Sequence, residues 1–292
     1  MMFGKHSAGI YEKAFDPNIS WAERLDRAAR LGFDYLEISI DETDARLERL
    51  DWDKAQKKAL LNAIQDSGVA LRSMCLSGHR RFPFGSADPA LGQKAHQIME
   101  KAIDFAGDLG IRVIQLAGYD VYYEESTPES VQRFAEGMQW AAQQAAKAQV
   151  MLAMEIMDTP FMNSISKHLP YEEQIRSPWY KVYPDLGNLS AWSENDPAAE
   201  LEKGIDSIVA IHLKDTLPPK GDFPGKFKCV PFGSGCVDFP ARFGQLERLG
   251  YHGPYMIEMW YAEGTDDMQE IKNAAQWLDE QYKKGISQCW KN

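Results

Sequence analysis

The sequence lacks the features that mark several common classes of protein. Its four cysteines are scattered without C-x-x-C spacing, which argues against a zinc ribbon or a disulfide framework and favours free thiols. It has no lysine- and arginine-rich tract and a net charge of −11, so nonspecific binding to nucleic acid is not expected. No apolar run reaches the length of a membrane span, and no apolar leader stands near the N-terminus. We therefore expect a cytoplasmic protein with neither a nucleic-acid nor a membrane partner.

A glycine-rich phosphate loop is missing as well. Residues 4–9 do not fit the G-x-G-x-x-G pattern, and Gly233-Ser234-Gly235 comes too late in the chain and opens no clear helix. This absence argues against a doubly wound open sheet, which would carry such a loop after an early strand.

The chain does have a repeated signal for a helix that leads into a strand. Gly32, Gly110 and Gly250 each follow a helical pattern and precede an apolar run, as left-handed residues at helix ends do. Ser20 and Thr127 are positioned as N-caps of helices. Eight short apolar runs alternate with the helical segments, at about 6–10, 34–40, 69–75, 111–117, 150–156, 179–185, 207–213 and 254–260.

This alternation predicts parallel strands joined by crossover helices, and eight such units in 292 residues suit a closed barrel. We expect one domain, a single (β/α)8 TIM barrel over residues 1–292. Its core should span about residues 6–285, with a long loop at about 214–238.

Four consecutive predicted strands end in residues that bind metals: Glu155, Asp185, His212 and Glu258. Each one alone would more often be a solvated, capping or core residue, but chemistry in such barrels lies at the C-terminal ends of the strands. Three converging carboxylates would repel one another strongly unless a cation lay between them. Oxygen ligands with one imidazole suit one divalent ion, which could be Zn²⁺, Mn²⁺, Mg²⁺ or Co²⁺.

Glu155 and Glu258 could also flank a bound ligand, because they end strands five and eight. With the metal acting as a Lewis acid, one glutamate would remove a proton beside a carbonyl and the other would return a proton to the opposite face. The result would be epimerisation, whereas transfer on one face would give isomerisation. The residues by themselves leave both outcomes open.

Other residues near the strand ends are candidates for binding the substrate. Positive charge gathers at His79, Arg80 and Arg81, and a phosphate would fit there. Ser234 lies in a glycine-flanked loop whose backbone N–H groups could approach an anion. The other candidates are a second cation, two ligands for sugar hydroxyls, two further polar residues and three aromatic walls, namely Lys214, Glu37, Gln115, Ser77, Asn188, Tyr11, Trp192 and Trp260.

Several strings between about residues 8 and 285 carry a more specific signal. Examples are His79-Arg80-Arg81-Phe82-Pro83, Ala153-Met154-Glu155-Ile156-Met157-Asp158 and Ile257-Glu258-Met259-Trp260. They resemble the L-ribulose-5-phosphate (L-xylulose-5-phosphate) 3-epimerases of the xylose-isomerase-like TIM-barrel superfamily. The resemblance implies a divalent metal and a pentulose phosphate substrate, as in ascorbate-type sugar-acid catabolism. It also implies that Glu155 and Glu258 are the catalytic acid/base pair of an isomerase, which interconverts L-xylulose 5-phosphate and L-ribulose 5-phosphate through a metal-stabilised enediolate.

Two departures bear on the substrate. Ketose 3-epimerases that act on free sugars often have a histidine three residues after the metal aspartate, whereas this chain has Asn188, which favours the phosphate branch. The segment 217–229 is longer than the resemblance leads us to expect and could reshape specificity.

Alternative functions are a related ketose or sugar-phosphate epimerase or isomerase, a phosphodiester-cleaving metal hydrolase of the same superfamily, and a noncatalytic barrel. The hydrolase branch usually has more histidine and aspartate ligands and a basic face, and this chain has only six histidines. The many aromatic and methionine residues favour a homodimer.

Overall fold

The computed structural model describes residues 2–289, and this part of the chain contains the eight expected strands in the expected order. They are β1 (Ala8–Tyr11), β2 (Tyr35–Ile40), β3 (Ala70–Leu76), β4 (Val113–Ala117), β5 (Met151–Glu155), β6 (Tyr180–Tyr183), β7 (Ile211–Leu213) and β8 (Tyr255–Ile257). Each predicted apolar run overlaps one of them, with β1 and β3 each extending one residue beyond the predicted run, so the eight strand predictions are confirmed.

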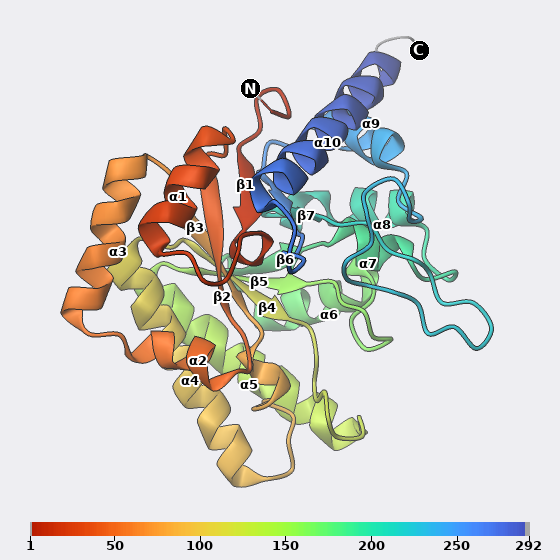
Figure 1. Cartoon of the computed structure of the whole chain (residues 1–292). Coiled ribbons are helices and arrows are strands. Elements are labelled where there is room, and N and C mark those ends of the chain that lie inside the picture. The colour runs from red at the N-terminus through yellow and green to blue at the C-terminus, as the bar shows by residue number, and fades with distance from the viewer. Residues whose placement is uncertain (1, 290–292) are drawn as a thin grey trace.

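The strands pair in parallel in the order β6-β5-β4-β3-β2-β1-β8-β7. Two isolated parallel bridges, Val182 to Ile208 and Asp185 to His212, bring the two outer strands together. The result is a nearly closed eight-stranded barrel with helices between the strands, which confirms the predicted fold class (Figure 1).

The helix termini that the sequence predicts, such as the starts after Ser20 and Thr127 and the end before Gly110, are found in the structure. The helices are α1 (Trp21–Arg30), α2 (Asp44–Leu47), α3 (Lys54–Ser67), α4 (Pro89–Leu109), α5 (Pro128–Ala148), α6 (Ile165–Ile175), α7 (Leu186–Ser190), α8 (Pro197–Gly204), α9 (Phe239–Arg248) and α10 (Asp267–Cys289). Ser20 Oγ accepts the Glu23 N–H of α1 at 3.1 Å. Gly110 ends α4 with φ 74°, a conformation that costs glycine little. None of the helices in the described chain is long and apolar enough to cross a membrane.

The inside of the barrel has an apolar layer below a polar one. Tyr35, Ala153 and Met256 belong to a buried cluster between the strands. Side chains two positions apart lie on the same face of a strand, so Glu155 lies one step beyond Ala153, and Glu258 one step beyond Met256. The strand period therefore puts both carboxylates inside the barrel at its C-terminal end.

The longest connection follows β7 and runs from 214 to 238, where the sequence predicts a long loop. It folds back on itself through antiparallel bridges from Leu217 to Lys226 and from Lys220 to Phe223. In Figure 1 it extends away from the barrel beyond α7 and α8.

Candidate metal centre and active site

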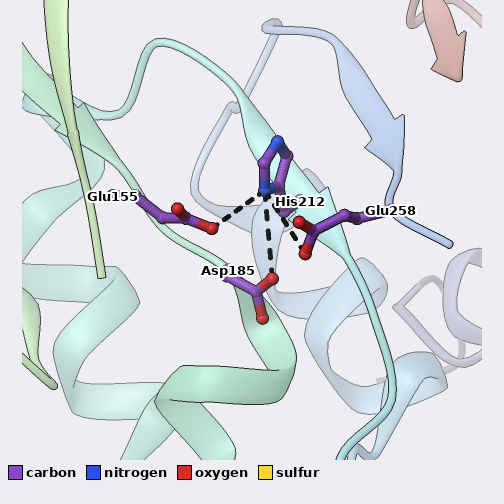
Figure 2. A group of neighbouring side chains, drawn as sticks. All are labelled: Glu155, Asp185, His212 and Glu258. Atoms are coloured by element: carbon purple, nitrogen blue, oxygen red, sulfur yellow. Dashed lines mark hydrogen bonds and ion pairs between the residues drawn. The ribbon is translucent and has the colours of Figure 1, made fainter. Parts of the chain in front are cut away.

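The four predicted metal ligands lie together at the C-terminal end of the barrel. His212 Nδ1 is 3.1 Å from Glu155 Oε1, 3.9 Å from Asp185 Oδ2 and 3.8 Å from Glu258 Oε2. One ligand atom from each residue lies within 4.8 Å of the others, and all four residues are buried. Figure 2 shows Glu155 and Glu258 approaching His212 from opposite sides. We call these residues the ligand group.

Asp185 both caps a helix and faces the ligand group, one carboxylate oxygen for each. Asp185 follows β6 and is the N-cap of α7, where its Oδ1 accepts the Asn188 N–H at 2.8 Å. Its other oxygen, Oδ2, faces His212 and the ammonium of Lys214. A carboxylate that looks like an ordinary helix cap in the sequence therefore also belongs to the ligand group.

The ligand group has more negative than positive charge. Lys214 Nζ lies 3.0 Å from Asp185 Oδ2 and 3.1 Å from Glu258 Oε2. Burial raises the pKa of Asp185, whereas at Glu258 the effect of burial is outweighed by Lys214 and His212, which lower its pKa to about 2. Three carboxylates and one imidazole whose ligand atoms converge, with Lys214 as the one ammonium beside them, form a donor set that fits a divalent cation with oxygen and nitrogen ligands.

A cavity lies over the ligand group and contains part of the predicted substrate-binding set. Glu155 and Glu258 share its wall with six of those residues: Tyr11, Ser77, Arg80, Asn188, Lys214 and Trp260. A ligand in this cavity can therefore contact both glutamates and side chains from the loops that follow β1, β3, β6, β7 and β8.

Arg80 is a cation of the cavity wall that two aromatic rings hold in place. It ends the short helix η3 (Gly78–Arg80), and its guanidinium lies over the rings of Tyr119 and Tyr122, 5.4 and 5.3 Å from their centroids. The phenol of Tyr119 donates to Asp158 and accepts a long hydrogen bond from Arg80 Nη2 at 3.4 Å. Among the described residues Arg80 Nε has no hydrogen-bond partner, and Asp158 reaches the guanidinium only through Tyr119, so Arg80 can still bind a ligand.

Two expected sugar-binding residues lie below the ligand group instead of on the cavity wall. Glu37 is the third residue of β2, and its Oε1 lies 3.0 Å from Nε2 of His212. Gln115 is the third residue of β4 and donates its side-chain amide to Glu155 Oε2. Both were expected at strand ends, but they lie in mid-strand and contact His212 and Glu155 of the ligand group from below.

Three other candidates lie outside the cavity wall. His79 is buried, donates to the Ala95 carbonyl at 3.1 Å and packs against Phe84, and burial lowers its pKa to about 4. Arg81 forms an ion pair with Asp44 at 2.6 Å. Ser234 is exposed on the long loop.

Trp192, expected as an aromatic wall, packs against Phe227 of the long loop with ring centroids 5.9 Å apart. It is not part of the cavity wall.

The sequence analysis missed three polar residues of the cavity wall: Lys13, Asp158 and Lys228. Lys13 forms an ion pair with Asp41 at 2.5 Å, whereas Lys228 is exposed on the long loop and lies over Trp260, 6.0 Å from the ring centroid. Asp158 stands inside a string that the sequence analysis did single out. Nothing local in the sequence marks Lys228, because its position depends on the path of a 25-residue connection.

The fold and the ligand group define a class of protein. A family model described as "Xylose isomerase-like TIM barrel" matches residues 25–281, and the chain belongs to this family.

Curated relatives are more specific. The chain is 57% identical over 274 residues (94% of this chain, 96% of the relative) to a protein of Escherichia coli (strain K12) provisionally named L-ribulose-5-phosphate 3-epimerase SgbU. It is 54% identical over 270 residues (92% and 93%) to L-ribulose-5-phosphate 3-epimerase UlaE of Escherichia coli (strain SMS-3-5 / SECEC). These similarities confirm the predicted resemblance. A solved structure of an L-ribulose 3-epimerase superposes with a TM-score of 0.75 at 20% identity, covering 97% of this chain and 96% of that chain, which supports the fold.

Proposed function

We propose that this protein is a metal-dependent 3-epimerase that interconverts L-xylulose 5-phosphate and L-ribulose 5-phosphate. The observation that carries the proposal is the position of Glu155 and Glu258 on opposite sides of one ligand group, on the wall of one cavity. Relatives with more than half of their residues identical are named as epimerases of this substrate. A cytoplasmic location and a part in ascorbate-type catabolism belong to the same proposal.

Glu155, Asp185, His212 and Glu258 would hold the divalent cation, which would act as a Lewis acid on the substrate's C2 carbonyl. One glutamate removes the proton from C3, and the electron pair of that C–H bond moves toward the carbonyl oxygen to give the enediolate. The glutamate on the opposite side delivers a proton to the other face of C3, and the carbonyl re-forms. The configuration at C3 is inverted, and no oxidant or reductant is needed.

Arg80 is the group that we assign to the phosphate. Stacking on two tyrosines holds the planar guanidinium in place, and its charge is not neutralised by a carboxylate among the described residues. Lys228, at the rim of the same cavity, supplies a second positive charge. Asn188 donates its side-chain amide to the Ile156 carbonyl at 2.8 Å and also lines the cavity, where it can face a sugar hydroxyl.

The test is NMR of L-xylulose 5-phosphate with the protein and Mg²⁺ or Zn²⁺ in D₂O. The proposal expects L-ribulose 5-phosphate to form with solvent deuterium at C3. Exchange at C1 instead would identify an aldose–ketose isomerase, and no exchange with either metal would overturn the epimerase assignment. Cleavage of abasic-site DNA by the same sample would favour the hydrolase branch.

A further inference from the structure

Glu37 is a buried carboxylate that the reaction does not use. Its side chain is 0% exposed, in the middle of β2, on the same strand face as the buried Tyr35. It does not line the cavity, so it cannot touch a substrate there. A carboxylate in this position is costly unless it is hydrogen-bonded, so its partners should show what it does.

Those partners are His212 and, more weakly, Tyr183. Glu37 Oε1 lies 3.0 Å from His212 Nε2, and the Tyr183 phenol donates to Glu37 Oε2 at 3.4 Å. The other ring nitrogen of His212, Nδ1, faces the three carboxylates of the ligand group. The imidazole therefore lies between Glu37 on one side and the ligand group on the other.

We propose that Glu37 is a positioning residue for the metal centre: it accepts the Nε2 proton of His212 and so leaves Nδ1 unprotonated and directed at the ligand group. This inference rests on the metal site of the proposed function. It assigns to Glu37 a different partner from the sugar hydroxyls that the sequence suggests.

The number of protons on the imidazole decides which of its nitrogen atoms can bind a metal. A neutral imidazole has one N–H and one lone pair, and a metal needs the lone pair. If Nδ1 held the proton, the lone pair of Nε2 would face the buried oxygens of Glu37 without a proton between them, which is unfavourable. Rotating the ring by 180° would place carbon atoms against both sets of oxygens. With a cation at the ligand group, which leaves no room for a proton on Nδ1, one tautomer and one ring orientation therefore satisfy both sides of His212.

A carboxylate bonded to a ligating histidine also increases the basicity of the ligating nitrogen, and loss of such a partner commonly weakens metal affinity by ~10–100-fold. Two variants of Glu37 distinguish its effect on the orientation of the His212 ring from the effect of its negative charge. In Glu37→Gln the amide oxygen can still accept the Nε2 proton, so orientation persists and the negative charge is lost. In Glu37→Leu both are lost. Tyr183→Phe is the matched control, because it removes the long bond to Glu37 Oε2 and leaves the short contact between Glu37 and His212 in place.

The first measurement is the dissociation constant for Mn²⁺, obtained by electron paramagnetic resonance on metal-stripped protein, with Asp185→Asn reporting ions bound elsewhere. We expect Glu37→Leu to bind about 10–100-fold more weakly than wild type, Glu37→Gln to fall between the two, and Tyr183→Phe to match wild type. Equal affinity of Glu37→Leu and wild type would overturn the inference.

The second measurement is the tautomer of His212 in the Zn²⁺-loaded protein, from long-range ¹H–¹⁵N correlations of ¹⁵N-histidine protein. We expect a proton on Nε2 in wild type and in Glu37→Gln, so this reading stands even if Glu37→Leu does not fold. A proton on Nδ1 would overturn the inference. Wild type that binds metal but does not exchange deuterium at C3 would refute the epimerase and leave the role of Glu37 intact. Wild type that binds neither ion at the ligand group would refute both.

Discussion

Two buried acidic sites at the C-terminal end of this barrel differ in how their charge is balanced. Glu12 follows β1, is 1% exposed and forms ion pairs with Arg46 and with Arg49, the latter at 2.7 Å. It also accepts the Ser39 N–H at 2.9 Å. The ligand group has three carboxylates, and its nearest cationic partners are Lys214 and His212.

The first site is balanced by the chain itself, whereas the second is short of positive charge. Burial, followed by the neighbouring Arg49, lowers the pKa of Arg46 to about 10, so both arginines stay charged at neutral pH. A position near a strand end therefore does not separate a structural carboxylate from a ligand, but the local balance of charge does. The following predictions test this difference, from the largest expected effect to the smallest.

Glu258→Gln should abolish most of the enzymatic turnover and leave the stability of the fold nearly unchanged. We expect turnover of L-xylulose 5-phosphate to fall by ~10²–10⁴-fold, because an acid/base group and a metal ligand are lost together. The free energy of unfolding should change by less than about 1 kcal/mol, since Lys214 keeps Asp185 as a partner and carboxylate repulsion is relieved. Initial rates and urea titration measure the two quantities. A variant with near wild-type turnover would remove Glu258 from the mechanism.

Glu12→Gln should do the reverse. It leaves the half-buried guanidiniums of Arg46 and Arg49 without their shared carboxylate, so we expect a loss of about 3 kcal/mol in the free energy of unfolding measured in urea, the low end of the range for breaking a buried pair. Glu48→Gln, at an exposed site in the same region, is the control and should change stability by less than about 0.5 kcal/mol. If both variants unfold at the wild-type urea concentration, the Glu12 site is not structural.

Removal of metal with a chelator should affect only the ligand group. We expect turnover to be lost and then restored by added divalent ion, and metal at 100 times its dissociation constant should stabilise the fold by about 2.7 kcal/mol. Calorimetric melting with and without metal checks this. Glu12→Gln should keep the metal-induced shift and Glu258→Gln should lose most of it. A wild-type melting temperature indifferent to every divalent ion would contradict a metal at this site.

Arg80→Met, compared with Arg81→Met, tests whether the cation on the cavity wall binds the phosphate and the cation paired with Asp44 does not. Loss of a charged contact to phosphate should raise KM for the phosphorylated ketose by ~10–100-fold, with little change for the free ketose. Arg81→Met is the matched control, because Arg81 pairs with Asp44 outside the cavity wall. Steady-state kinetics on both substrates decides, and an equal rise for both substrates would place the phosphate elsewhere.

Glu172 offers a third, less buried carboxylate for the same comparison. Although burial raises its pKa, contacts from His168, Lys181 and Ser207 lower it to about 2. A carboxyl group whose pKa is lower in the folded than in the unfolded protein stabilises the fold at pH values above the ordinary pKa of a glutamate. This stabilisation disappears as the pH falls from about 4.5 toward about 2. We expect Glu172→Gln to cost about 1 kcal/mol at pH 6 and almost nothing near pH 2. Urea unfolding of both proteins across this range checks the trend, and a pH-independent difference would contradict it.

Much of the fold can be predicted from short stretches of the sequence. Caps such as Ser20, glycine ends such as Gly110 and the apolar runs each depend on a few neighbouring residues, so the eight strands could be predicted in order. Glu155 and Glu258 could be predicted for a related reason. In a parallel barrel the ends of all strands meet at one rim, so a strand-end residue has a known destination.

The tertiary structure decided the rest, because it depends on contacts between distant segments. Glu37 and Asp185 are both acidic residues that the sequence places near strand ends, but the packing of β2 beneath His212 puts Glu37 behind the imidazole, whereas Asp185 joins the ligand group. Arg80 and Arg81 are neighbours in sequence, and the turn of η3 sends one over two tyrosines and the other to Asp44. The charge around a buried acid is set by side chains from several strands, so no single stretch of sequence shows whether the chain itself neutralises that acid or leaves it for a cation.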